Sequence, residues 1–143
     1  MVEWFTFGFI RNWLQWAEKE LGYVGLNLVN SQEPTAELRP TEKSQTDEDD
    51  LMPYPILVEI EKLAIGGHKS PMEVFDILST QKLTSQDALK SHISKFFRLW
   101  SYNQWKRERL APSFHLDDFN IDPKTWCRFP ILSGSFVEEL KLL

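Results

Sequence analysis

The stretch that decides the fold is "LTSQDALKSHISKFFRLWSYNQWKRERLAP", residues 83–112. Its apolar side chains recur every three or four residues, the spacing of one buried helix face: Leu89, Ile93, Phe96 and Trp100. Thr84 and Asp87 are spaced as in a capping box at a helix start. Pro112 halts the helix, because proline lacks the backbone N–H that a continuing helix needs. The stretch therefore predicts one long helix from about residue 84 to Pro112.

The end of this predicted helix changes character. At 100° per residue, the buried face continues through Asn103, Gln104 and Arg107. Trp105 points to the opposite side, and Lys106 projects from the flank, where a flexible ammonium can reach an anion. One interpretation is a solvated helix end, where the helix dipole favours cations. Because this does not explain Trp105, we also consider a helix end flanked by two surfaces, such as a ligand pocket and a neighbouring subunit.

Working outward from this helix, periodicity and capping signals predict four further helical segments: residues 9–21, residues 49–67, a short helix from Ser70, and residues 136–142. Gly22 ends the first of these segments, since glycine suits the residue after a helix. Ser70 and Glu73 form a capping box around Pro71. The first segment is so aromatic that we expect it to meet a partner surface.

The remaining segments are less regular. Residues 23–40 are bounded by Pro34 and Pro40, which predicts a brief strand or extended segment before a turn. Residues 41–50 are polar and acidic, which indicates either a mobile loop or a functional lid. Four or five helices with little strand make the chain mainly α. The acidic loop and irregular tail fit the second half of a layered α/β protein whose strands lie upstream.

Composition excludes several functions. A net charge of -5 argues against a nucleic-acid partner, because such affinity comes mainly from many basic contacts to phosphates. No apolar run is long enough for a membrane span, and the single Cys127 cannot form an internal disulfide, so we expect a cytoplasmic protein without a membrane partner. The three histidines lack metal-ligand spacing, so we assign no metal ligand.

Four motifs then carry a resemblance to a known family: "PTAELRP" (34–40), "TDEDDLMPY" (46–54), "NQWKRERLAPSFH" (103–115) and "DPKTWCRFPILSG" (122–134). In this order and at these distances they resemble the C-terminal part of bacterial glutamine-dependent NAD synthetase. The resemblance covers residues 9–143. Residues 1–8 are an atypical or truncated N-terminal junction, with Phe7 about where the family has a lysine.

The resemblance implies membership of an α/β adenine-nucleotide-hydrolase-like, Rossmann-like synthetase domain. It also implies a ligase reaction, in which deamido-NAD is amidated to NAD with ATP and glutamine-derived ammonia, giving AMP and diphosphate. By the family's motifs, Thr35 would contact ATP and Lys106 would contact deamido-NAD, with Trp105 replacing a histidine of some shorter relatives. ATP and Mg²⁺ would serve the intact enzyme, which would be a homo-oligomer with the dinucleotide at a subunit interface.

The departures from the family are equally informative. The chain has no serine- and glycine-rich pyrophosphate loop and no Cys-Glu-Lys glutaminase set, so we assign no catalytic residue. It would depend on N-terminal glutaminase and ATP-loop portions, and alone it is expected to be inactive and to hold no cofactor tightly. The alternative hypothesis is a non-catalytic helical protein-interaction module.

Overall fold

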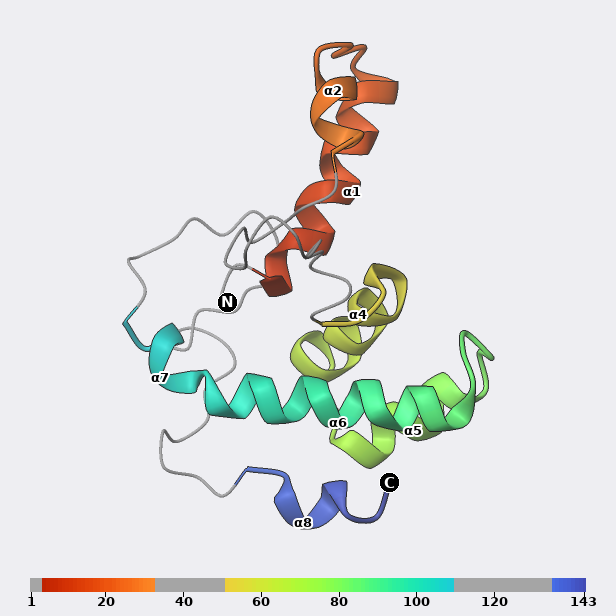
Figure 1. The fold of residues 1–143 in the computed structure, drawn as a ribbon, viewed down its shortest axis with the longest axis vertical. Helices are drawn as coiled ribbons and strands as arrows, with labels where there is room; N and C mark the ends of the chain where they lie inside the picture. Colours follow the sequence, from red (N-terminus) through yellow and green to blue (C-terminus); the bar gives the residue numbers. More distant parts are fainter. Residues whose placement is uncertain (1–3, 33–50, 110–134) are drawn as a thin grey trace, which may run out of the picture.

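The computed structural model describes residues 4–32, 51–109 and 135–143, and every regular element in these ranges is helical (Figure 1). This confirms the prediction of a mainly α chain. In chain order the elements are α1 (Trp4–Glu20), α2 (Leu26–Asn30), α4 (Tyr54–Glu61), the π-helical turn η1 (Lys62–Gly66), α5 (Pro71–Ser79), α6 (Gln86–Tyr102), α7 (Gln104–Arg107) and α8 (Val137–Leu140). None of the described helices is long and apolar enough to cross a bilayer.

Helix α6 forms the centre of the core, with α4 and α5 packed against it (Figure 1). The four side chains predicted to face inward are all buried, as is the neighbouring Phe97. They meet apolar side chains of α4, α5 and the segment before α4: Leu51, Met52, Ile56, Leu57, Ile60, Val74 and Leu78. Phe96 lies between an edge-to-face contact with Phe97 and a stacked contact with Trp100. The periodicity of α6 thus located the core correctly.

The predicted start of α5 is confirmed, and the predicted start of α6 is wrong by one residue. At α5, the Ser70 amide donates to the Glu73 carboxylate over 2.9 Å, which completes the capping box. At α6 the N-cap is Ser85, whose hydroxyl accepts a hydrogen bond from the Ala88 amide at 3.3 Å. Ser85 has the extended backbone that an N-cap requires, so it takes the role expected of Thr84.

Two other expectations about secondary structure are corrected. The long helix does not run on to Pro112: α6 ends at Tyr102, Asn103 adopts φ -91° and ψ 8°, and the separate turn α7 follows. The segment predicted as strand or extended chain contains α2, because turns at residues 24 and 25 let the backbone continue into a helix. The described backbone amides of both Leu26 and Asn27 accordingly donate to carbonyls three residues back.

Helix α1 is confirmed, although it is less covered than its periodicity predicted. It ends at Glu20, and Gly22 with φ 69° provides the left-handed residue that stops it. On the predicted buried face only Ala17 is buried, whereas Ile10, Trp13 and Leu21 are each about half exposed. Periodicity identified the apolar face of α1, but the described chain covers only part of that face.

Candidate functional site

A buried polar cluster lies where α6 meets α7. Asn103, Gln104 and Arg107 are no more than 2% exposed. These are the residues through which the buried face of α6 was predicted to continue, so the predicted change from an apolar to a polar core face is confirmed. A side chain as costly to bury as arginine requires specific contacts.

The contacts of Arg107 fasten α7 to the last turn of α6. Its guanidinium lies 3.6 Å from the ring centroid of Trp100, within the range of a cation–π interaction. One of its terminal nitrogens donates to the Trp100 carbonyl oxygen and, over 2.7 Å, to the Gln104 side-chain oxygen. The Gln104 amide in turn donates to the Glu108 carboxylate over 3.0 Å. Asn103 bends the chain, and Arg107 fixes the direction that α7 then takes.

The opposite side of α7 carries a cluster that we call the Trp105 cluster, formed by Trp105, Lys106 and Arg109. Trp105 is 42% exposed. The Lys106 ammonium lies 5.6 Å and the Arg109 guanidinium 5.5 Å from the centroid of the Trp105 ring. An indole face with two adjacent cations can pack against a planar ring while binding a carboxylate or phosphate. This arrangement suits a ligand that is both aromatic and anionic.

The structure therefore brings two of the three predicted binding residues together. Trp105 faces outward, as predicted, and Lys106 lies beside it, while Thr35 lies outside the described residues. Arg109 belongs to the same basic run in the sequence as Lys106, but the sequence did not assign it a binding role. Its position four residues after Trp105 was the available signal, because side chains at that spacing are neighbours on a helical turn.

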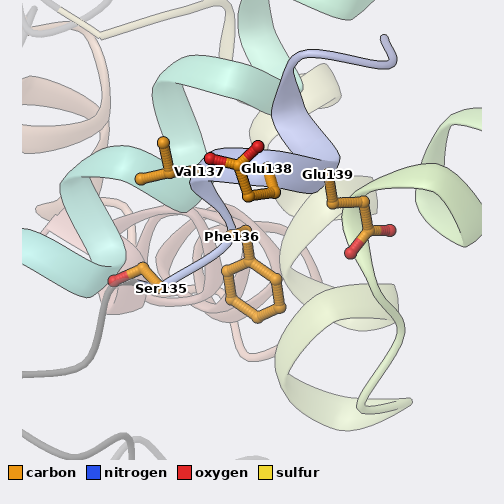
Figure 2. Close-up of a pocket in the computed structure, with 5 residues that line it drawn as sticks. All are labelled: Ser135, Phe136, Val137, Glu138 and Glu139. Atoms are coloured by element: carbon orange, nitrogen blue, oxygen red, sulfur yellow. The ribbon is translucent and has the colours of Figure 1, made fainter.

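The open hollow beside α8 is a second candidate for a binding site, but the side chains that line it make contacts that hold the fold together. It is lined by residues 135–139, which Figure 2 draws as sticks. The Glu139 carboxylate accepts hydrogen bonds from the Ser70 hydroxyl at 2.6 Å and the Met72 amide at 3.0 Å. Phe136 meets Phe97 edge to face, with ring centroids 4.8 Å apart. The acidic side chain thus caps the start of α5 and holds α8 on the core.

Metal ligation finds no support in the described part of the chain. Within residues 4–32, 51–109 and 135–143, no three His, Cys, Asp or Glu side chains gather closely enough to hold an ion. Of the two histidines in these ranges, His92 lies in α6, where partial burial and then the charge of Lys95 lower the pKa of its imidazole. The Trp105 cluster therefore remains the feature best suited to bind a ligand.

Two of the three comparisons with known proteins lead to the same family. No family model matches the chain. A glutamine-dependent NAD(+) synthetase of Arabidopsis thaliana is 31% identical over 123 residues, which cover 78% of this chain and 16% of the relative. A putative glutamine-dependent NAD(+) synthetase of Schizosaccharomyces pombe is 29% identical over 118 residues, which cover 79% of this chain and 17% of the relative. The crystal structure of a glutamine-dependent NAD(+) synthetase from Cytophaga hutchinsonii matches 93% of this chain and 20% of its own, with 50% identity and a TM-score of 0.72.

The fold and these matches define the chain as the C-terminal part of a larger synthetase domain. It spans about a sixth of the length of the curated relatives that it matches and a fifth of the solved one. The family is that of the glutamine-dependent NAD(+) synthetases, to which this chain belongs as a C-terminal portion. The resemblance carried by the four sequence motifs is thereby confirmed.

Proposed function

We propose that this chain acts as the C-terminal part of a glutamine-dependent NAD synthetase and that Lys106 and Trp105 contact deamido-NAD. The intact enzyme would amidate deamido-NAD to NAD with ATP and glutamine-derived ammonia, releasing AMP and diphosphate. The observation that carries the proposal is the Trp105 cluster: an exposed indole beside two cations. The names and similarity of the relatives support the reaction class.

The chemistry of deamido-NAD fits this cluster. The molecule has planar rings, a nicotinate carboxylate and a diphosphate. The Lys106 ammonium can donate to either anion, and the Trp105 ring can pack against a planar ring. Lys106 and Trp105 would thus bind and orient the substrate, while adenylation of its carboxylate and displacement of AMP by ammonia would depend on groups elsewhere. Arg107 would act indirectly, by holding α7 in position.

Several parts of the proposal concern residues or molecules beyond the described ranges. The Thr35 hydroxyl would donate a hydrogen bond to ATP. Mg²⁺ would accompany the ATP phosphates, but the described residues offer it no ligand set, so we assign it none. The intact enzyme would be a cytoplasmic homo-oligomer. This chain alone would be inactive, and formation of NAD by the purified chain from deamido-NAD, ATP and glutamine or ammonia would contradict that statement.

A chimera provides the test of function. The matched fifth of the Cytophaga hutchinsonii synthetase is replaced by this chain, and NAD formation is measured with varied deamido-NAD. Lys106→Ala should lower kcat/KM for deamido-NAD by roughly 10-fold to 150-fold, the equivalent of the usual 1.5–3 kcal/mol for a hydrogen bond to a charged group.

Lys90→Ala is the matched control for that substitution. Both lysines are half-buried, and the Lys90 ammonium lies 5.3 Å from the centroid of the Phe75 ring, much as Lys106 lies by Trp105. Lys90 belongs to α6 but lies near its other end, far along the helix from α7. Equal losses of kcat/KM in the two variants would remove Lys106 from the substrate site.

The alternative function, a non-catalytic protein-interaction module, has one observation in its favour. Large apolar side chains of α1 and α2 are exposed, as is typical of a surface that meets another protein. The two functions differ in the role of the Trp105 cluster. If the chain only docks a partner, Lys106→Ala in the chimera should leave the kinetics for deamido-NAD unchanged.

A further inference from the structure

Side-chain hydrogen bonds link the helices α1 and α2. The pair extends away from the rest of the described bundle (Figure 1). The Glu18 carboxylate accepts hydrogen bonds from Asn27 at 2.9 Å and from Asn30 at 2.6 Å, and the Asn30 amide also donates to the Leu14 carbonyl at 3.3 Å. Hydrogen bonds to one carboxylate therefore hold α2 against α1, where a small helical hairpin would usually use apolar packing.

Much of the exposed surface of this pair is apolar. Between residues 10 and 32, Ala17 alone is buried. The exposed apolar side chains form what we call the hairpin face: Ile10, Trp13, Trp16, Leu21, Tyr23, Val24, Leu28 and Val29. Trp13 is 50% and Trp16 49% exposed, and at a spacing of three residues they are neighbours on α1. Elsewhere, exposed apolar side chains such as Leu83 are more scattered, which needs no explanation.

Burial of this surface would be favourable, because each exposed tryptophan offers a large apolar area at little cost in conformational entropy. The hydrogen bonds to Glu18 leave the pair preorganised with its tryptophans outward, which reduces the cost of docking. A helical pair held by hydrogen bonds, with several large apolar side chains exposed, is thus expected to be completed by another surface.

The solved relative indicates which surface could cover the hairpin face. Almost all of this chain, 93%, matches only 20% of the Cytophaga hutchinsonii synthetase, at a TM-score of 0.72. In that protein, the same arrangement of helices belongs to a chain about five times as long, so most of the polypeptide lies outside the match. We propose that the hairpin face docks against the remaining part of a synthetase subunit. This proposal rests on the proposed function, because it takes the partner from the same family.

The first test uses the 143-residue chain itself and the double variant Trp13→Gln with Trp16→Gln. Because both side chains are half exposed, we expect the variant to retain its helical circular dichroism and to bind less of a hydrophobic dye such as ANS. Both proteins should sediment as monomers. Loss of helical structure in the variant would show that the tryptophans stabilise this chain internally and would overturn the proposal.

A different sedimentation result would also overturn it. If the original chain forms a dimer that the double variant abolishes, the hairpin face binds a second copy of the chain. Neither result depends on catalytic activity.

The second test places the same double variant in the chimera described above. We expect the melting temperature of the chimera to fall by at least about 5 °C, while that of the isolated chain changes much less. Leu83→Gln is the control, since Leu83 is 45% exposed and lies in the turn between α5 and α6. Leu83→Gln should change the melting temperatures of the chimera and of the isolated chain equally. A chimera that does not fold would contradict the proposal. So would a chimera whose melting temperature is unchanged by the double variant.

Failure of docking and failure of function can be told apart. The docking result is a melting temperature that depends on Trp13 and Trp16. The functional result is deamido-NAD kinetics that depend on Lys106. If the double variant destabilises the chimera but Lys106→Ala leaves kcat/KM for deamido-NAD unchanged, docking is supported and the proposed substrate contact is rejected.

Discussion

Glu61, the last residue of α4, should make the chain less stable as the pH rises. Burial raises the pKa of its carboxyl from 4.5 to about 9. Its Oε1 atom is buried and accepts no hydrogen bond from the part of the chain that the structure describes. A carboxyl in such surroundings keeps its proton at neutral pH, because the charged form would lose its hydration without gaining a partner.

The sign and size of the effect follow from linkage. Between pH 4.5 and about 9, the unfolded chain releases the Glu61 proton while the folded chain retains it, so the unfolded state binds fewer protons and becomes favoured. Stability from this group is fully present below pH 4.5 and is lost progressively up to about pH 9. Each pH unit in this window costs about 1.4 kcal/mol, so the loss at pH 7 is roughly 3 kcal/mol.

The perturbation is Glu61→Gln, which keeps the shape of the side chain and removes the titration. Urea unfolding of both proteins at pH 5, 6, 7 and 8 gives the free energy of unfolding at each pH. We expect the difference in the free energy of unfolding between the variant and the original protein to move in favour of the variant by roughly 3 kcal/mol from pH 5 to pH 7. Other titrating groups, including His92, are common to both proteins and cancel in this difference.

Glu59→Gln provides the control for this series. Glu59 also belongs to α4, but its carboxylate lies at the surface and pairs with Lys62 at 2.6 Å. Its replacement removes a carboxyl from the same helix without touching Glu61, and so separates the effect of burial from the loss of any carboxyl of α4. If the curves of Glu61→Gln and the original protein run parallel from pH 5 to 8, Glu61 is ionised and hydrated in the folded chain, and the argument from burial is refuted.

Three further predictions concern other contacts. Arg107→Ala should reduce the free energy of unfolding by roughly 2–4 kcal/mol in a urea titration, because it removes hydrogen bonds from a charged group and the stacking on Trp100. A smaller loss of unfolding free energy than that of Lys106→Ala would contradict this expectation. Glu139→Ala should cost about 1–2 kcal/mol and increase hydrogen exchange in α8, and unchanged exchange there would show that the cap does not hold α8 in place. In the chimera, Thr35→Val should raise the KM for ATP with little change in melting temperature, whereas a lower melting temperature with an unchanged KM would make Thr35 structural.

The sequence predicted the core of this chain better than its surface. The 3.6-residue period located the buried face of α6 and its polar continuation through Arg107, because the period depends only on backbone geometry. It did not predict the bend at Asn103, since no glycine or proline marks that position. The bend is instead stabilised by the contacts of Arg107 with Trp100 and Gln104, which the apolar period does not encode.

The half-exposed face of α1 shows a different limit. Periodicity indicates which side of a helix is apolar, but it does not indicate whether the same chain covers that side. Ile10 and Trp13 fit the pattern of a buried face and are nevertheless about half exposed. The Trp105 cluster shows a similar limit: the spacing predicted an outward Trp105, and the sequence placed Arg109 in the same basic run, but only the structure shows that Arg109 lies beside the Trp105 ring.

The most direct test of the account is a calorimetric titration of deamido-NAD into the chimera that carries this chain, compared with its Lys106→Ala variant. Lys106 stands beside an exposed indole on a turn that Arg107 holds in place, so we expect the variant to bind deamido-NAD roughly 10-fold to 150-fold more weakly, with Lys90→Ala unaffected. Equal dissociation constants for the original chimera and Lys106→Ala would contradict the account and leave the cations of α7 as a solvated helix end.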